Sequence, residues 1–329
     1  MNQCWLIVGG GNMGMRHANH LRFLYPQACI IILSFHLDEL EDASYVVKTL
    51  EDALKFDPKC AIISNAAPQH CEFAKELISR EIHVLIEKPL SDSYEKSLDL
   101  LNYSQSFPET VVLVGYQLRY KPGFSIVKNN LKAGLLGKII YAKASVGHFL
   151  PMWRPQNYKH SVSAQKFLGG GVLLELSHEF DYIKNIFGMP DSLQCVSGRM
   201  SNLEIDVEDV AFSTFHYCSN LVVSISQNMI DQLPHRTLEI IGEKGILTWD
   251  LRSDTINIYD HSQRKLHEQY RSGIENSREL YIKEIQHFVK CIMQQEQPQV
   301  TLRDACETMK LIDLAKNSSE ISKPIQVIE

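Results

Sequence analysis

The sequence predicts an α/β protein of two domains: an N-terminal domain on a parallel sheet, and a C-terminal α/β domain with a large, mostly antiparallel open sheet. Three observations predict it. The chain has 329 residues, more than one hydrophobic core usually supports. Continuous apolar runs alternate with helical patterns in the N-terminal part, and longer strands of alternating polarity follow them. We therefore expect domains at residues 1–121 and 122–329.

Five apolar runs predict the strands of the first domain. Each run is short and continuously apolar, as are strands of a parallel sheet that is covered on both faces. Helical patterns separate the runs, which predicts βαβ units. The runs are Cys4–Val8, Cys29–Leu33, Cys60–Ser64, Ile82–Ile86 and Val111–Val114.

Beyond Arg119–Phe124 apolar and polar residues alternate. Alternation predicts antiparallel strands with one buried face and one face that is open or paired with another subunit. Apolar residues at three- and four-residue steps then predict two helices, and Thr301 with Asp304 predicts a cap for the second. The strands are expected at residues 139–149, 209–217, 220–229, 237–242 and 245–251, and the helices at residues 280–295 and 301–318.

Composition excludes several classes of protein. Hydrophobic residues make up 44% of the chain and charged residues 22%, which argues against disorder. A formal net charge of -6 offers no basic field to nucleic acid. The N-terminus has no positive segment before a short apolar run, which predicts a cytoplasmic protein without signal peptide or membrane span. Eight scattered cysteines without a C-x-x-C pair predict reduced, mostly buried thiols.

A glycine motif follows the first predicted strand. Gly9, Gly11 and Gly14 form G-x-G-x-x-G, with Asn12 and Met13 between the last two glycines. Such glycines allow a tight turn and close approach of the backbone to a pyrophosphate at the start of a helix. Because a strand precedes the motif and a helical pattern follows it, we expect a Rossmann dinucleotide-binding domain. The alternative is a glycine-rich structural turn.

The end of the second strand bears on which dinucleotide binds. An acidic residue there would bond the ribose hydroxyl of NAD, but Ser34 occupies this position and no arginine or lysine is adjacent. A serine can bond either a hydroxyl or a phosphate. NAD and NADP both stay open, with a slight preference for NAD.

A second motif, Glu87-Lys88-Pro89, ends the fourth predicted strand, and "NAAPQH" at residues 65–70 precedes it. Together with the glycine turn, these pieces resemble the Gfo/Idh/MocA family of sugar and cyclitol oxidoreductases. The resemblance covers the whole chain, through residues 115–122, 131–139, 169–181 and 239–247 and the two C-terminal helices.

The resemblance implies a nicotinamide cofactor and oxidation or reduction at a ring hydroxyl or ketone. It implies that Lys88 lies beside the nicotinamide and the reacting oxygen, where an ammonium can stabilise a developing alkoxide. It also implies that Ala66, Pro68, His70 and Glu87 contact the cofactor. From the residues alone, Glu87 and Lys88 could also be a solvated strand end before a turn-making proline.

The stretch "GGGVLLELSHEFDY" at residues 169–182 predicts one amphipathic helix whose apolar stripe packs the second domain. In the family a histidine after the glycine triplet is the usual acid/base and an aspartate orients it. His178 and Glu175 are the nearest matches, and residues three apart on a helix can touch. The alternatives are a histidine with a packing role, and a metal site, which a single E-x-x-H does not support.

Candidates for substrate binding lie in two other segments. Gln117 and Arg119 follow the last strand of the first domain, where Arg119 could hold a substrate group or pair with an acid. Trp153, Arg154 and Tyr158 lie in a long connection typical of binding lids, although an oligomer contact would suit them equally. Glu81 stands where relatives usually have glycine, which predicts a locally different helix cap.

We therefore expect an NAD(P)-dependent oxidoreductase that transfers a hydride at a hydroxyl or keto carbon of a sugar, cyclitol or sugar derivative. A role in making sugars of surface polysaccharides is a further possibility that the resemblance raises. The alternatives are a redox-neutral enzyme that recycles its cofactor, and a cofactor-binding sensor. We expect a small carbohydrate-like partner, no metal, and a homodimer or homotetramer.

Overall fold

The computed structural model describes residues 4–154, 157–272 and 277–328. Contacts divide the chain into two compact units. The first comprises Met1–Gln117 and Ser277–Met309, and the second comprises Leu118–Asn276 and Lys310–Glu329. In this division Ser277–Met309 belongs to the first unit. The expected domain bounds, residues 1–121 and 122–329, stay a prediction.

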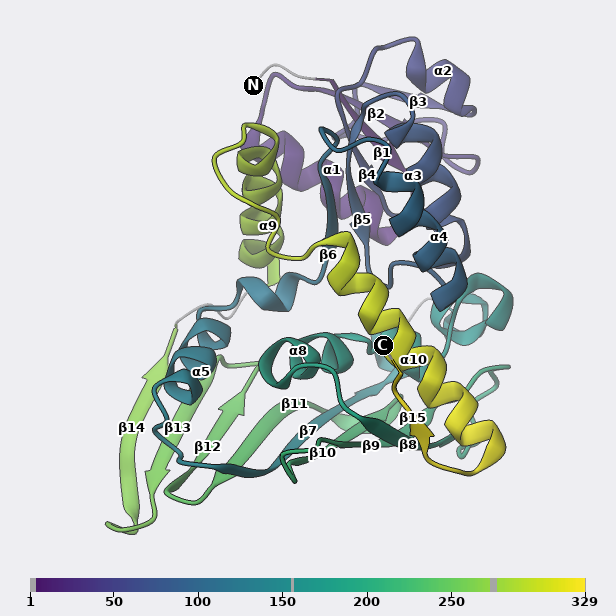
Figure 1. The fold of residues 1–329 in the computed structure, drawn as a ribbon. Helices are drawn as coiled ribbons and strands as arrows, with labels where there is room; N and C mark the ends of the chain where they lie inside the picture. The colour runs from purple at the N-terminus through teal and green to yellow at the C-terminus, as the bar shows by residue number, and fades with distance from the viewer. Residues whose placement is uncertain (1–3, 155–156, 273–276, 329) are drawn as a thin grey trace. The chain divides into compact units, whose positions relative to one another are not determined.

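Six parallel strands form the sheet of the first unit, in the order β3-β2-β1-β4-β5-β6 (Figure 1). This is the doubly wound order of dinucleotide-binding domains, which bind ligands at the carboxyl ends of the strands. All five predicted strands are confirmed, and one further short strand was missed. The strands are β1 Cys4–Val8, β2 Cys29–Leu33, β3 Tyr45–Val47, β4 Cys60–Ile63, β5 His83–Glu87 and β6 Val112–Gly115.

Helices pack on this sheet through a core that includes residues far apart in the sequence. Trp5 of β1, Ile30 of β2 and Phe288 of the late helix α9 belong to one buried cluster. The rings of Trp5 and Phe288 lie 6.1 Å apart, and this packing explains why α9 joins the first unit. The helices are α1 Asn12–Leu24, α2 Leu50–Leu54, α3 His70–Ile78, α4 Tyr94–Ser104 and α9 Ser277–Ile292.

The second unit contains a nine-stranded sheet in the order β14-β13-β12-β11-β7-β10-β9-β8-β15. Only β7 and β10 pair in parallel among these described strands, so the predicted antiparallel character is confirmed. The strands are β7 Ile139–Phe149, β8 Ser192–Gly198, β9 Val210–His216, β10 Val222–Asn228, β11 Ile230–Gly242, β12 Gly245–Asp250, β13 Thr255–Asp260, β14 Lys265–Arg271 and β15 Ile325–Gln326.

One face of this sheet carries α8 (Figure 1). Phe180 of α8 packs edge-on against Phe215 of β9, with ring centroids 5.2 Å apart, whereas Phe212 points the other way and is 54% exposed. The alternation predicted for β9 is therefore confirmed, and pairing of the open face with another subunit stays a prediction. The helices are α5 Pro122–Lys132, α6 Leu150–Trp153, α7 Val172–Glu175 and α8 His178–Phe187.

The long helix α10, Leu302–Ile321, contributes to both units, which divide it after Met309. Its predicted cap is confirmed: Thr301 Oγ1 accepts the main-chain N–H of Asp304 at 3.1 Å, and Asp304 Oδ2 accepts that of Thr301 at 3.1 Å. Across the described ranges, no helix has both the length and the hydropathy of a membrane span.

Candidate active site

The glycine turn lies between β1 and α1. Gly9 has φ of +104°, and a Cβ on it would lie 2.7 Å from the main-chain nitrogen of Asn65. A Cβ on Gly14 would lie 1.8 Å from the carbonyl oxygen of Gly9, whereas a Cβ on Gly11 would meet nothing within 4 Å. Gly9 and Gly14 therefore let the turn close, and Gly11 leaves the space that a pyrophosphate needs.

The N-terminus of α1 suits an anion. Its N-cap, Gly11, makes no side-chain bond to the first turn, which includes Asn12 and Met13 and carries no acidic residue. The first N–H groups of a helix have no partner within it, so they and the positive end of the helix dipole favour an anion there. The residues present fit the diphosphate of a dinucleotide.

Ser34, which was expected at the ribose, follows β2 and is 5% exposed. Its hydroxyl oxygen accepts the main-chain N–H groups of His36 at 3.3 Å and Leu37 at 3.2 Å, so it shapes the loop. Lys48 also reaches this loop: its ammonium bonds the Leu37 carbonyl and lies 2.8 Å from Asp38. Lys48 was missed because it follows β3, a strand too short to be predicted.

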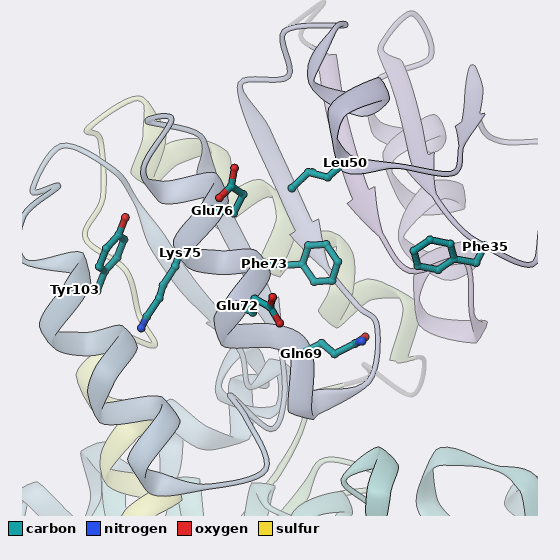
Figure 2. A pocket seen from close by; sticks show the side chains of 8 residues that line it. All are labelled: Phe35, Leu50, Gln69, Glu72, Phe73, Lys75, Glu76 and Tyr103. Atoms are coloured by element: carbon teal, nitrogen blue, oxygen red, sulfur yellow. The ribbon is translucent and has the colours of Figure 1, made fainter.

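A cavity of about 500 Å³ opens beside the same loop. Figure 2 shows Phe35 from the loop, Leu50 from α2 and Phe73 from α3 facing one space. An apolar wall with a few polar groups suits a flat aromatic base. No sequence pattern pointed to this wall, because its residues come from separate elements. Gln69, Glu72, Lys75, Glu76 and Tyr103 complete the lining.

Glu87 is the last residue of β5, and Lys88 and Pro89 follow it. Glu87 is 5% exposed, and its Oε1 lies 2.7 Å from His17 Nε2 on α1. Its Oε2 accepts the main-chain N–H of Lys88 at 3.2 Å. Burial raises the pKa of Glu87, but the His17 bond and the charges of His17 and Lys88 outweigh it and lower the pKa. Glu87 is a buried, ionised anchor, so the reading as a solvated strand end is wrong for Glu87.

His70 begins α3 and is 1% exposed. Its Nδ1 lies 3.0 Å from the carbonyl oxygen of Pro89, and its Nε2 lies 3.0 Å from that of Asn65. Burial lowers the pKa of His70, and the two carbonyl bonds oppose this shift. His70 thus joins the "NAAPQH" segment to the segment that contains Lys88. Direct contact of His70 with the cofactor stays a prediction.

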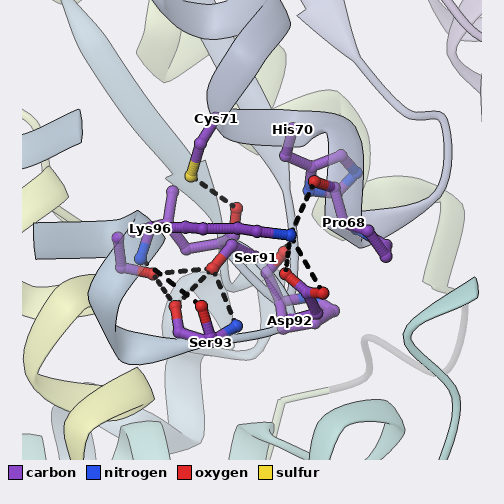
Figure 3. A network of polar contacts seen from close by, with 10 residues as sticks. Pro68, His70, Cys71, Ser91, Asp92, Ser93 and Lys96 are labelled. Atoms are coloured by element: carbon purple, nitrogen blue, oxygen red, sulfur yellow. Dashed lines mark hydrogen bonds and ion pairs between the residues drawn. The ribbon is translucent and has the colours of Figure 1, made fainter. Parts of the chain in front are cut away.

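A polar network holds the chain just after Pro89 (Figure 3). The Cys71 thiol points at the carbonyl oxygen of Leu90, with sulfur and oxygen 3.8 Å apart. The ammonium of Lys96 lies 2.8 Å from Asp92 and donates to the carbonyl oxygen of Pro68 at 3.3 Å. Pro68, expected near the cofactor with Ala66, lies in η1, Ala67–Gln69, for which Ala66 is the N-cap. Side chains from α3 and α4 therefore fix both the segment that contains Pro68 and the chain just after Pro89.

The prediction of one helix after the glycine triplet is wrong. The chain forms α7, ending at Glu175, and α8, beginning at His178. The carbonyl oxygen of Leu176 between them accepts the side-chain N–H of Gln227 from β10 at 2.7 Å. Since Glu175 and His178 do not share a helix, the spacing argument for their contact fails, and the contact stays a prediction.

Glu208 explains the last glycine of the triplet. Its carbonyl oxygen accepts the N–H of Val172 at 2.9 Å, and its carboxyl oxygen Oε1 accepts that of Leu173 at 3.2 Å. A Cβ on Gly171, which has φ of +110°, would lie 2.4 Å from this carboxyl group. The triplet thus lets Glu208 cap α7, and this positions Glu175.

His178 and Glu175 are both buried, at 3% and 8% exposure. Glu175 Oε2 lies 3.8 Å from Arg154 NH2, a wide ion pair. Glu179 is completely buried and lies 2.9 Å from Arg236 Nε of β11. The polar side chains at the start of α8 are therefore buried and do not form a solvent-exposed face.

Arg119 forms an ion pair with an acidic side chain, which was one of its two expected roles. Its Nε and NH2 donate to the two carboxyl oxygens of Asp181 at 2.8 and 2.6 Å, and both side chains are 2% exposed. A role for Arg119 as a substrate ligand stays a prediction. Gln117 donates from Nε2 to the hydroxyl of Tyr281 at 3.1 Å, within the first unit.

The predicted binding lid consists of short helical turns around Trp153 and Arg154. The guanidinium carbon of Arg154 lies 4.8 Å from the Trp153 ring centroid, and the ring centroids of His148 and Trp153 lie 5.6 Å apart. Burial, followed by the charge of Arg236, lowers the pKa of His148 to about 4. The Tyr158 hydroxyl accepts a main-chain N–H from Glu204 at 3.4 Å. Pro155 and Gln156 lie outside the described residues.

Cysteines and possible metal ligands add little to this site. In the part of the chain that the structure describes, no three or more His, Cys, Asp or Glu side chains gather as a metal site would require. All eight cysteines are free thiols and most are buried, as predicted.

Comparison with known proteins settles the family. Residues 4–116 match the family model of an oxidoreductase NAD-binding Rossmann fold, and residues 128–327 match that of the C-terminal α/β domain of the same oxidoreductases. The chain belongs to the Gfo/Idh/MocA family. It is a nicotinamide-dependent oxidoreductase whose N-terminal unit is the NAD-binding domain.

Individual dehydrogenases are similar to this chain over nearly its whole length. A scyllo-inositol 2-dehydrogenase (NAD(+)) of Bacillus subtilis is 25% identical over 98% of this chain and 95% of its own. A levoglucosan dehydrogenase solved with NADH and levoglucosan superposes with a TM-score of 0.85 over 100% of both chains at 17% identity. The WlbA dehydrogenase from Bordetella pertussis, solved with NADH and UDP-GlcNAcA, gives 0.80 over the same coverage at 17% identity.

Proposed function

We propose that this family member is an NAD-dependent dehydrogenase acting on a ring hydroxyl of a sugar, cyclitol or sugar derivative, with Lys88 and His178 as its catalytic residues. The observation that carries the proposal is the anchored Glu87-Lys88-Pro89 segment at the carboxyl end of β5. Glu87 and His70 hold the main chain of this segment, and the segment carries the ammonium of Lys88.

The division of labour follows from the chemistry. The nicotinamide, when bound, accepts or returns the hydride. The Lys88 ammonium donates a hydrogen bond to the substrate oxygen and stabilises negative charge that develops on it. His178 takes the hydroxyl proton on oxidation and returns it on reduction, since imidazole suits proton transfer near neutral pH. Glu175 orients the substrate or His178, together with its partner Arg154.

The cofactor site favours NAD in this proposal. Gly9, Gly11 and Gly14 with the start of α1 hold the diphosphate, and the wall of Phe35, Leu50 and Phe73 holds the adenine. Ser34 offers the ribose a single hydroxyl, and the ammonium of Lys48 is already bonded within the loop. A 2′-phosphate would have to draw this ammonium from its bonds with Leu37 and Asp38, which a ribose hydroxyl does not require.

The substrate class rests on the named relatives and on the rings near the Arg154 loop. Trp153 is an aromatic ring of the kind that sugar rings stack on, and Arg154, which lies over this ring, offers a planar set of donors. Gln117, Arg119 and Tyr158 remain candidates for substrate contact. An activated or amino sugar of surface polysaccharides is the finer form of the proposal.

The test is a panel of inositols, free sugars and nucleotide sugars, each assayed with NAD+ and NADP+ by the absorbance of reduced nicotinamide. We expect turnover with at least one cyclic polyol and a higher kcat/KM with NAD+. Lys88→Met and His178→Gln should lower kcat by about a hundredfold or more while retaining NAD+ binding by calorimetry. As a matched control, Lys59→Met removes an exposed ammonium before the amino end of β4 and should keep the wild-type kcat.

Two results would contradict the proposal. One is unchanged kcat in both Lys88→Met and His178→Gln. The other is a purified protein that keeps its cofactor bound and converts substrate without net formation of NADH, which would establish the redox-neutral alternative.

A further inference from the structure

Glu87, the residue before Lys88, interacts with buried side chains from two other elements of the first unit. His17 of α1 and Glu284 of α9 are both 0% exposed, and Glu87 of β5 is 5% exposed. One oxygen of Glu87 lies 2.7 Å from His17 Nε2, and the other accepts the main-chain N–H of Lys88 at 3.2 Å. The Glu87 carboxylate therefore connects α1 to the main chain of Lys88.

The negative charge of this cluster lies on Glu87. Burial, and then the charge of Glu87, raises the pKa of Glu284 well above its ordinary value. Two neighbouring buried carboxyl groups do not both ionise. Since Glu87 has the His17 bond and Glu284 has none, the proton stays on Glu284 and the charge on Glu87.

Packing does not account for these polar groups. Among the described residues, neither carboxyl oxygen of Glu284 has a hydrogen-bond partner, and Nδ1 of His17 has none either. Burying polar groups without partners costs stability, and such groups gather at functional sites. The cluster therefore points to a role in the chemistry of the neighbouring residue.

The main chain is held on the other side of Lys88 as well. The carbonyl oxygen of Pro89 lies 3.0 Å from His70 Nδ1, and the thiol of Cys71 points at the next carbonyl. Figure 3 shows His70 and Cys71 turned toward this segment from α3. The His17–Glu87 pair completes this support from the α1 side.

We propose that His17 is a positioning residue for Lys88 that acts through the carboxylate of Glu87. The inference rests on the proposed function, in which Lys88 contacts the substrate oxygen. His17 fixes the position of the Glu87 carboxylate, and this carboxylate accepts the main-chain N–H of Lys88. Because Glu284 is uncharged, the negative charge of the cluster stays on Glu87, beside His17. Without a donor at position 17, the buried carboxylate shifts and the Lys88 side chain shifts with it.

The test compares His17→Leu, which removes the donor, with His17→Gln, whose amide can still donate to Glu87. His20→Leu is the matched control: His20 lies on the same helix, is 3% exposed, and stacks on Tyr281 at 5.8 Å. Burial lowers the pKa of His20 to about 4, so this control removes no charge at neutral pH.

The first readout needs no substrate. The full-length protein is treated with a small acylating reagent, and mass spectrometry gives the labelling rate of Lys88 relative to Lys96. We expect His17→Leu to change this ratio by about threefold or more, the size expected within one bonded network. His17→Gln and His20→Leu should keep the wild-type ratio. With the best panel substrate, His17→Leu should lower kcat about tenfold or more, as misplaced groups do, at unchanged KM.

Two outcomes overturn the inference: an unchanged labelling ratio in His17→Leu, or an equal change in His20→Leu. If the ratio responds as expected but no protein turns over any panel substrate, positioning is supported and the proposed function fails. Should His17→Leu not fold, His17→Asn takes its place, because its shorter amide does not reach Glu87. Rescue by His17→Gln separates positioning from a merely structural role, which any well-packed residue would fill.

Discussion

At the residue scale, buried charged groups separate side chains with a proposed catalytic role from side chains that position them. Arg119 pairs with Asp181 through two bonds in a nearly solvent-free place. Sequence alone could not choose between this pair and a substrate contact, because the partner lies far along the chain. The role of the Glu87-Lys88-Pro89 motif was predictable through the family resemblance, which the place of the motif at the end of a strand supports. His17 and Glu284 were not, since single residues on separate helices form no motif.

Replacing Glu284 by glutamine should stabilise the protein at alkaline pH. The pKa of Glu284 is raised in the fold, so its contribution to stability is complete below its ordinary pKa and is lost as pH rises through the folded value. Glutamine has no proton to lose. We expect Glu284→Gln to raise the free energy of unfolding near pH 8 but not near pH 4, measured by urea titration.

The control for this prediction is Glu279→Gln, on the exposed first turn of the same helix. It should change the unfolding free energy little at either pH. An equal effect of Glu284→Gln at both values would show that the pKa of Glu284 is not raised in the fold.

Removing one partner of the Arg119–Asp181 pair should be strongly destabilising. Asp181→Asn leaves a buried guanidinium without its counter-charge, which typically costs about 3–5 kcal/mol. Denaturant unfolding measures the loss, with the exposed Asp191→Asn as comparison. The double variant Arg119→Met with Asp181→Leu should recover most of the stability, because a packed apolar pair replaces the ions. A loss below about 1 kcal/mol in Asp181→Asn would mean that water screens the pair.

At the element scale, periodicity predicted the strands and long helices well and failed where tertiary contacts decide. β1, β2 and β7 have their predicted bounds, because continuous or alternating apolar patterns define them. β14 was missed because "KLHEQYR" is an edge strand of mostly exposed residues. The break between α7 and α8 involves no glycine or proline. It depends on Gln227 of β10, which lies far along the chain from this segment.

The end of α3 offers a direct test of local backbone strain. Glu81 was expected to form a cap different from that of glycine, but it adopts the left-handed conformation with φ of 57°, so that expectation is wrong. Left-handed backbone costs a non-glycine residue roughly 1 kcal/mol. Glu81→Gly should therefore raise the free energy of unfolding by up to about 1 kcal/mol. Glu76→Gly, within the same helix, should lower it, and an equal loss in both variants would exclude a strained Glu81.

At the scale of the whole molecule, each unit contributes its own part to the proposed reaction. The first presents a glycine turn, an apolar cavity and an anchored lysine, and the second presents a buried histidine at the start of α8. NAD+ alone should bind the first set. Hydrogen exchange with and without NAD+ should show new protection at residues 9–16 and 34–37, and the absence of protection there would place the cofactor elsewhere.

The most direct test of the central claim is transfer of a labelled hydride. The full-length protein is incubated with NAD+ and a panel substrate deuterated at its ring carbons, and mass spectrometry measures deuterium in the reduced cofactor. We predict one deuterium per NADH formed by the wild type, and almost none from Lys88→Met or His178→Gln although both still bind NAD+. Turnover without deuterium in the cofactor, or full transfer by both variants, would contradict the account.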